Sequence, residues 1–504
     1  MPRERPLGPY ERYSLARHNV HQAPAVVFTA RVRSRSRIDP ATLESCVAAL
    51  LDRHPLLNAS VPNPLEPCPK FSLNGQVDPR QVVAVANVGL VESSERVLLA
   101  GLGAINAFDI SRAPLWRVWT YPEDANRGTE WHRITLGVHH VLADGSATRN
   151  LFVELLDLVK LSIDSETTDS TRSGQDESVG AVPPTLEATV DVRPSTFALV
   201  KTVFSELVAP KLPAFLRPAP SPSFWPNPPV VSPRTRRTAL NLLFVEPDLA
   251  RNLGVESKRF GVKTLQPVFV TAAFVAIART LLVLDDRDGS PSTELVSIKS
   301  QTPISLRNPS LGHPTSTGNY VASVSASPPP VSLASLSTAQ FWSECRAYGA
   351  HLVDRRSIEQ AKQGMGMLSF LPCGDASVKD PTTGRIVERR TGWEKWLVEG
   401  MESAKPWKGG SFEVSNLGRM GKTGWEDDDA IKDVCWAQPG SSVGVGLQFN
   451  AVSCATGVLS ISMTHREGAI DKRQVDRIWT SFGHILRKIA KGDMAEDTTL
   501  DQIG

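Results

Sequence analysis

No Cys-x-x-Cys pair occurs among the six cysteines of this sequence, and their spacing follows no repeat. Zinc sites and small disulfide frameworks are built on such spacings, so their lack argues against a bound metal and against structural disulfides. The sequence also has no large excess of positive or negative charge, since it contains 55 lysines and arginines and 53 aspartates and glutamates. Composition therefore gives no reason to expect nucleic acid or an anionic membrane as a partner. We expect reduced and mostly buried thiols at Cys46, Cys68, Cys345, Cys373, Cys435 and Cys454.

An apolar N-terminal segment is missing as well. The chain opens with Met-Pro-Arg-Glu-Arg and no apolar core follows, so it shows no secretory signal. The longest apolar run, Thr264 to Leu284, stops at a cluster of charges, and its length favours a buried helix over a membrane span. We therefore expect a cytoplasmic monomer without a transmembrane span. Its 504 residues, 41% of them hydrophobic, predict a globular protein with two large domains.

What the sequence does contain is the run His139-His140-Val141-Leu142-Ala143-Asp144-Gly145. In the preceding residues 131–138, apolar and polar side chains alternate as in a half-buried strand. From Leu151 onward apolar residues recur at helical spacing, so the run lies in a tight turn between a strand and a helix. Because successive strand side chains point to opposite sides, only one of the two histidines can face a given cavity. This argues against a metal held by both.

A histidine at the end of a strand suits general base catalysis, because the unperturbed pKa of imidazole lies near neutrality. A single histidine is more often structural. The fixed positions of His-His-x-x-x-Asp-Gly, however, should coincide by chance on the order of once in a thousand such proteins. We therefore prefer a functional interpretation of this run.

The pattern His-His-x-x-x-Asp-Gly resembles the signature of the acyl-CoA-dependent acyltransferase superfamily. That superfamily includes chloramphenicol acetyltransferase, the plant BAHD acyltransferases, wax ester synthases and the condensation domains of nonribosomal peptide synthetases. The opening residues Leu7 to Asn19 resemble the start of fungal alcohol acetyltransferases. Arg53-His54-Pro55-Leu56-Leu57 and Phe108 to Leu115 are also similar to blocks of the superfamily. We interpret His54 as a structural helix exit, since Pro55 fixes a bend there.

The resemblance implies roles for single residues. His140 would be the catalytic base, with Asp144 as the second catalytic residue of the motif and His139 and Gly145 as supporting residues. In relatives the aspartate is turned away from the histidine and pairs with an arginine. By that likeness Arg307 would form a structural ion pair with Asp144.

Two further blocks are similar to segments of the family. Asn319 lies in Gly318-Asn319-Tyr320, and Ser415 and Asn416 lie in Ser-Asn-Leu-Gly, expected at a turn after a strand. These three side chains are candidate contacts to the substrate or to a developing oxyanion. Ser415 and Asn416 would equally suit stabilisation of the turn itself. The plant-type Asp-Phe-Gly-Trp-Gly block is missing, which argues against a plant-type enzyme.

The resemblance and the alternation of strands and helices together predict an α/β fold. It would consist of two chloramphenicol-acetyltransferase-like sandwich domains with the active site in a channel between them. We place an N-terminal acyltransferase domain at 1–185, with a flexible insertion at 164–184. A proline-rich crossover follows at 186–235, and its apolar helix from Phe197 is expected to pack against the body, although peripheral lipid contact stays open. The C-terminal acyltransferase-like domain would span 236–504, with one strand predicted from Val443 to Leu459 and the next after it.

The expected reaction is acyl transfer from an acyl-CoA, foremost acetyl-CoA, to the hydroxyl of a small alcohol or secondary metabolite. His140 would take the hydroxyl proton and deliver it to the departing CoA sulfur. Acyl-CoA is then a co-substrate, no cofactor is bound, and no acyl-enzyme forms, because no serine or cysteine accompanies the motif. No glycine-rich phosphate loop identifies the CoA-binding groups. The alternatives are an amine acceptor of sphingoid-like type, a freestanding condensation enzyme, and a non-catalytic binding scaffold.

Overall fold

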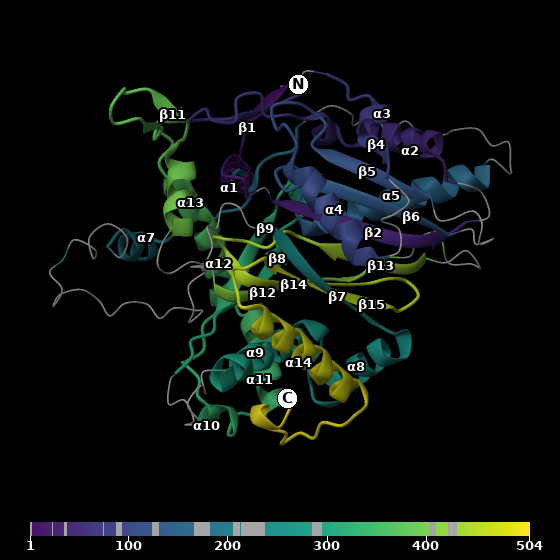
Figure 1. The fold of residues 1–504 in the computed structure, drawn as a ribbon, viewed down its shortest axis with the longest axis vertical. Coiled ribbons are helices and arrows are strands. Elements are labelled where there is room, and N and C mark those ends of the chain that lie inside the picture. Colours follow the sequence, from purple (N-terminus) through teal and green to yellow (C-terminus); the bar gives the residue numbers. More distant parts are fainter. Residues whose placement is uncertain are drawn as a thin grey trace.

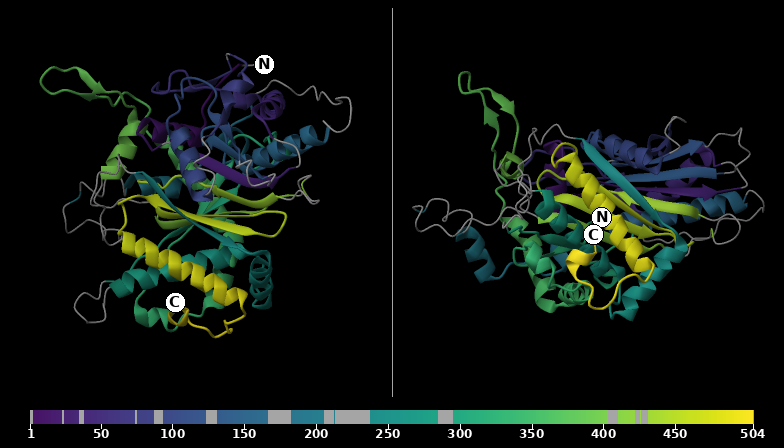
Figure 2. Two further views of the ribbon diagram at one scale, coloured as in Figure 1. Left: turned by 45° about the vertical axis from the view of Figure 1, so that its right-hand side comes forward. Right: turned by 60° about the horizontal axis from the view of Figure 1, so that its bottom comes forward.

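The protein is built on two mixed sheets that face each other (Figure 1). The computed structural model describes residues 3–22, 24–34, 38–73, 75–86, 93–122, 131–165, 182–204, 212, 237–284, 295–402, 410–421, 425 and 431–503. The predicted insertion at 164–184 and the proline-rich connector fall largely outside these residues. Figure 2 shows the two sheets from further directions, with helices on their outer sides.

The first sheet carries the histidine motif. Its strand order is β13-β2-β6-β5-β4, with bounds Ile431–Ala437, Ala25–Arg33, Trp131–His139, Trp116–Pro122 and Val83–Val85. One face packs on α2 (Pro40–Arg53) and α5 (Gly145–Ser165), and the other on α4 (Ser94–Asn106). Asp39 caps α2 by accepting a hydrogen bond from the Thr42 amide at 2.8 Å.

The second sheet has six strands in the order β7-β15-β14-β12-β8-β9. Their bounds are Thr238–Val245, Leu459–Arg466, Val445–Ser453, Gly410–Arg419, Ser300–Ser305 and Val321–Ala326. Its apolar face packs on four helices, which form the second core: α8 (Pro247–Arg259), α9 (Leu265–Leu284), α11 (Phe341–Val353) and α14 (Lys472–Ala490). These helices lie on the side away from the first sheet (Figure 1).

The inner face of the six-stranded sheet is polar although it is buried. Ser460, Ser462 and Thr464 of β15 all have at most 1% of their surface exposed. Ser460 and Ser462 donate hydrogen bonds to the carbonyls of Val434 and Trp436 in β13, both at 2.7 Å. The two sheets therefore meet through hydrogen-bonded polar groups.

The remaining elements lie around the two sheets. The helix α1 (Pro9–Asn19) contacts α12 (Arg355–Met367) and α13 (Gly392–Glu402). Smaller elements are β1 (Glu4–Pro6), β3 (Lys70–Ser72), α3 (Pro79–Val82), α6 (Leu186–Thr189), α10 (Leu333–Leu336), β10 (Val378–Lys379) and β11 (Ile386–Glu388).

Three expectations need correction. The strand predicted from Val443 to Leu459 is wrong, because β14 ends at Ser453 and a turn containing Gly457, at φ +93°, leads into β15.

The helix α7 (Thr196–Val203) does not pack its apolar side chains on the body, since Phe197 is 79% and Val200 60% exposed. The length of α9 does not exclude a span, since Leu265–Leu282 is long and apolar enough to cross a membrane, but 78% of that window is buried inside the protein, as in a core helix.

The chain also crosses between its two halves. β13 follows β12 in sequence but pairs with β2 at the edge of the first sheet. A boundary near residue 236 therefore does not separate the two sheets, and part of the C-terminal half completes the sheet that carries the histidine motif.

Candidate active site

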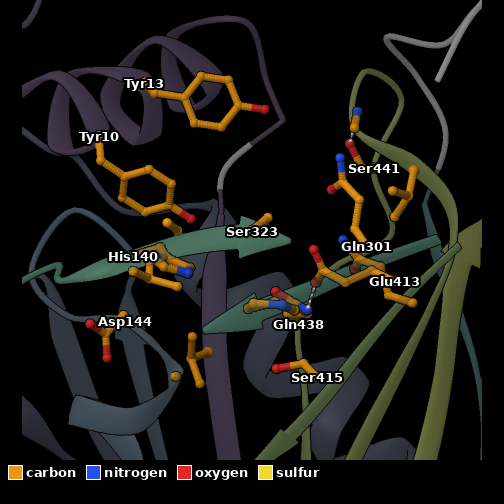
Figure 3. Close-up of a pocket in the computed structure, with 18 of the residues that line it drawn as sticks. Tyr10, Tyr13, His140, Asp144, Gln301, Ser323, Glu413, Ser415, Gln438 and Ser441 are labelled. Atoms are coloured by element: carbon orange, nitrogen blue, oxygen red, sulfur yellow. Dashed lines mark hydrogen bonds between the residues drawn. The ribbon is translucent and has the colours of Figure 1, made fainter. Parts of the chain in front are cut away.

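His140 lies directly after β6 and faces a cavity of about 150 Å³ between the sheets. Its amide donates to the Pro24 carbonyl at 3.0 Å, and only 8% of the residue is exposed. The ring of Tyr10 in α1 stands edge-on to the imidazole at 5.6 Å between centroids. Figure 3 shows His140 on one wall of the cavity, with Gln301 of β8, Glu413 of β12 and Gln438, which follows β13, on the other.

Asn319 fixes the imidazole of His140. Its amide nitrogen donates to the carbonyls of His140 and Val141 at 2.9 and 3.0 Å, so its oxygen must be the atom that meets His140 Nδ1 at 3.1 Å. An amide oxygen only accepts, so Nδ1 carries the hydrogen. Nε2 is then the unprotonated nitrogen and the basic atom of the ring.

Burial lowers the pKa of His140 from its ordinary value. The charge of Asp144 and the hydrogen bond to Asn319 act in the opposite direction but do not reverse the shift. The imidazole is therefore neutral at physiological pH, which is the state that a general base requires.

Asp144 is turned away from His140 and pairs with Arg307 at 2.8 Å, as the resemblance implies. The same carboxylate oxygen accepts from the Tyr320 amide at 2.9 Å, and the other accepts from the Ala147 amide at 2.8 Å, capping α5. Arg307 also donates to the carbonyls of Thr317 and Gly318, at 2.8 and 3.1 Å. Both side chains are buried, so this ion pair ties the motif loop to the segment after β8.

His139 points away from the cavity, as strand alternation predicts. Its Nδ1 accepts from the Val141 amide at 3.1 Å, and its Nε2 meets Nδ1 of His18 at 3.2 Å. Burial holds the pKa of His139 well below its ordinary value and lowers that of His18 to about 4. Gly145 begins α5 and borders the cavity.

Two of the predicted substrate contacts lie elsewhere. Asn319 does not line the cavity, because its amide is used in holding His140 and the motif backbone. Asn416 points away from the cavity as well, and its oxygen accepts from the Gly418 amide at 2.9 Å. Ser415 does line the cavity. Strand alternation sends Ser415 and Asn416 to opposite faces of β12. The strand runs on to Arg419, but its register with β14 shifts between Asn416 and Arg419, where Gly418 has φ +70°. Asn416 stabilises this irregularity, as the alternative interpretation predicted, whereas Ser415 does not.

Sequence reasoning missed the charged and aromatic residues of the cavity. Glu413 lies two residues before Ser415 on the same face of β12, a spacing that could have identified it. Burial raises its pKa to about 7. Tyr10, Tyr13 and Arg17 come from α1, where no periodic pattern shows which side faces a cavity. Among the described residues, no three His, Cys, Asp or Glu side chains are grouped to hold a metal ion.

Solved structures with the same fold come from several kinds of protein. The trichothecene 15-O-acetyltransferase TRI3 from Fusarium sporotrichioides superposes with a TM-score of 0.60 at 12% identity, over 97% of this chain and 94% of that one. The condensation domain of the monacolin K polyketide synthase MokA gives a TM-score of 0.56 at 13% identity, over 99% of each chain. The polyketide synthase associated protein 5 from Mycobacterium tuberculosis gives 0.55 at 15% identity, over 97% and 100%. These similarities confirm the predicted chloramphenicol-acetyltransferase-like α/β fold.

The family is shown by the sequence. No curated protein matches the chain significantly. The profile of the alcohol acetyltransferase family, however, matches residues 104–489, which include the histidine motif, the ion pair of Asp144 with Arg307, and Glu413 and Ser415 of the cavity. The chain therefore belongs to the alcohol acetyltransferase family and is an acyltransferase.

Proposed function

We propose that this protein transfers an acetyl group from acetyl-CoA to the hydroxyl of a small alcohol or secondary metabolite, with His140 as general base. The observation that supports this most is the set of hydrogen bonds around the imidazole. They leave Nε2 unprotonated in a ring that borders the cavity.

The chemistry would proceed in two proton-coupled steps. As Nε2 of His140 takes the proton of the acceptor hydroxyl, its oxygen attacks the thioester carbonyl of the donor and forms a tetrahedral intermediate. Collapse of that intermediate breaks the carbon–sulfur bond, and the imidazolium returns the proton to the departing thiolate. Products are the ester and free CoA.

Two hydroxyl groups on the cavity wall suit the charge that develops. Ser415 borders the cavity, and burial raises the pKa of Tyr10, so its phenol remains a hydrogen-bond donor. A donor placed at a developing oxyanion is worth roughly 10²- to 10³-fold in rate. Asp144 and Arg307 would hold the motif loop in shape, because they pair with each other and form hydrogen bonds to backbone groups.

The test is release of free CoA from acetyl-CoA by the purified protein with a panel of alcohols and amines, with the product identified by mass. Turnover with alcohols supports the proposal. Turnover with amines alone would show that the product is an amide and not an ester. If neither acetyl-CoA nor longer acyl-CoAs bind to the folded protein, the proposal of a CoA-dependent reaction is wrong.

A further inference from the structure

The wall of the cavity opposite His140 contains a row of polar side chains. Glu413 of β12 is paired in register with Gln301 of β8 on one side and with Gln448 of β14 on the other. Residues paired across neighbouring strands place their side chains on the same face of a sheet. All three border the cavity, whereas the flanking Phe412 and Val414 enter the apolar core behind the sheet.

Glu413 has one committed oxygen and one that faces the cavity. Its Oε1 accepts from Nε2 of Gln438 at 2.8 Å. The same Gln438 nitrogen donates to Oδ1 of Asn450 at 3.1 Å, and Asn450 donates to Ser462 at 3.2 Å. This chain of hydrogen bonds holds the carboxyl group in place. Figure 3 shows the second oxygen of Glu413 turned into the cavity, and no described residue donates a hydrogen bond to it.

Burying a carboxyl group in a wall costs free energy unless a hydrogen-bond donor meets it. Arg17 also borders the cavity, but its guanidinium lies over the ring of Tyr13 and makes no hydrogen bond to Glu413 among the described residues. The amide groups of a CoA arm could be met by neutral glutamines, which this wall has in Gln301, Gln438 and Gln448. A carboxylate accepts stronger hydrogen bonds than the amide oxygen of a glutamine does. A carboxyl group at this position therefore indicates a ligand that carries a strong hydrogen-bond donor.

We infer that Glu413 is a specificity-determining residue that binds a second hydrogen-bond-donating group of the acceptor, a hydroxyl or an ammonium. The inference rests on the proposed function and deepens it. The preferred acceptor carries two polar ends, one placed at His140 for reaction and the other at Glu413. A simple aliphatic alcohol of the same length leaves the carboxyl group unmet and is a poorer substrate.

Glu413→Gln is a size-matched test of this inference. Because Gln438 donates to the residue at position 413, the new amide oxygen must occupy the site of Oε1. The new amide nitrogen then faces the cavity and presents donors in place of an acceptor. Glu359→Gln, in an ion pair with Lys362 on α12 away from the cavity, is the matched control.

The experiment compares acceptors that differ only at the far end: hexan-1-ol, hexane-1,6-diol and 6-aminohexan-1-ol, with the corresponding butane and octane sets. The assays are run at about pH 8, because burial raises the pKa of Glu413 to about 7 and the carboxyl group is mainly ionised only above that value. Wild type is then expected to show a kcat/KM roughly 10- to 100-fold higher for the doubly polar member at one chain length, the range of a hydrogen bond to a charged group. Glu413→Gln should bring this ratio close to one, and Glu359→Gln should keep it. Preference for the amino alcohol over the diol identifies an ammonium as the recognised group.

Binding of the same acceptors without acetyl-CoA, followed by isothermal titration calorimetry, separates this inference from the proposed reaction. A binding preference that Glu413→Gln abolishes supports the inference even if no acetyl transfer occurs. Equal ratios in wild type and Glu413→Gln overturn it while leaving the reaction intact. A rise in KM for acetyl-CoA with an unchanged acceptor ratio also overturns it, because Glu413 would then serve the donor.

Discussion

At the scale of single residues, the site depends on how Asn319 orients one imidazole. The motif shows that His140 is special, but it does not show which ring nitrogen is basic. That follows from the amide of Asn319, whose nitrogen is used by two backbone carbonyls and whose oxygen is left for His140. The partner lies 179 residues away in sequence, so no local pattern could predict this contact.

The pH dependence of the reaction tests this arrangement. Since burial lowers the pKa of His140, the neutral base persists below pH 6.5, and the acid limb of kcat/KM should have its midpoint below that value. The hydrogen bond to Asn319 favours the charged imidazole, so Asn319→Ala should move the limb to still lower pH. It should also reduce kcat roughly 10²-fold through misplacement of the ring. An acid limb that does not move in Asn319→Ala would remove the positioning role.

At the scale of elements, an ion pair joins the motif loop to the segment after β8. The sequence predicted this pair by resemblance, and it is present at 2.8 Å with both partners buried. What the sequence could not predict is how many backbone groups the pair also holds, because these belong to loops whose conformation depends on the pair itself.

Breaking this pair from either side should destabilise the protein. Asp144→Ala or Arg307→Ala leaves an unmatched buried charge, and each should lower the free energy of unfolding by roughly 3 to 5 kcal/mol. The double variant should lose clearly less than the sum of the two, because it leaves no unmatched charge. Urea unfolding followed by circular dichroism measures all three. Strict additivity would show that the two charges do not interact.

Strand β12 offers a comparison between two adjacent residues. The Ser-Asn-x-Gly block was expected at a turn. The strand extends to Arg419, but its pairing with β14 shifts register after Asn416, at the positive φ of Gly418. Ser415→Ala should lower kcat by roughly 10² if its hydroxyl meets the oxyanion. Asn416→Ala, on the opposite face, should stay within about twofold of wild type. Steady-state kinetics of both variants decide this, and equal effects would contradict the assignment of the two faces.

At the scale of the whole molecule, a polar layer between two apolar cores forms the cavity. The buried helix predicted from Thr264 to Leu284 was confirmed as α9, because its apolar side chains lie in one core. The return of β13 to the first sheet was not predictable, since a strand's sequence does not specify which sheet it joins. Glu413 was missed for a similar reason, because its environment comes from residues far apart in sequence.

This polar layer should cost stability. The pKa of Glu413 is raised from 4.5 to about 7, so its neutral form is favoured in the folded state. The contribution of the protonated carboxyl group to the free energy of unfolding is fully present below pH 4.5, and it is lost as pH rises through about 7. Glu413→Gln removes this dependence, so its melting temperature should exceed that of wild type by more at about pH 8 than at about pH 5. A gap independent of pH would show that Glu413 ionises freely in the folded protein.

The central claim is that His140 is the base for acyl transfer, and its most direct test is the transfer rate of His140→Ala beside His54→Ala. Both histidines are at least partly buried, but His54 closes α2 and pairs with Glu154 at 2.7 Å, away from the cavity. With saturating acetyl-CoA and alcohol, His140→Ala should lose roughly 10²- to 10⁴-fold in kcat while keeping a folded thermal transition. His54→Ala should keep its kcat. A folded His140→Ala variant that transfers acetyl groups at the wild-type rate would contradict the account.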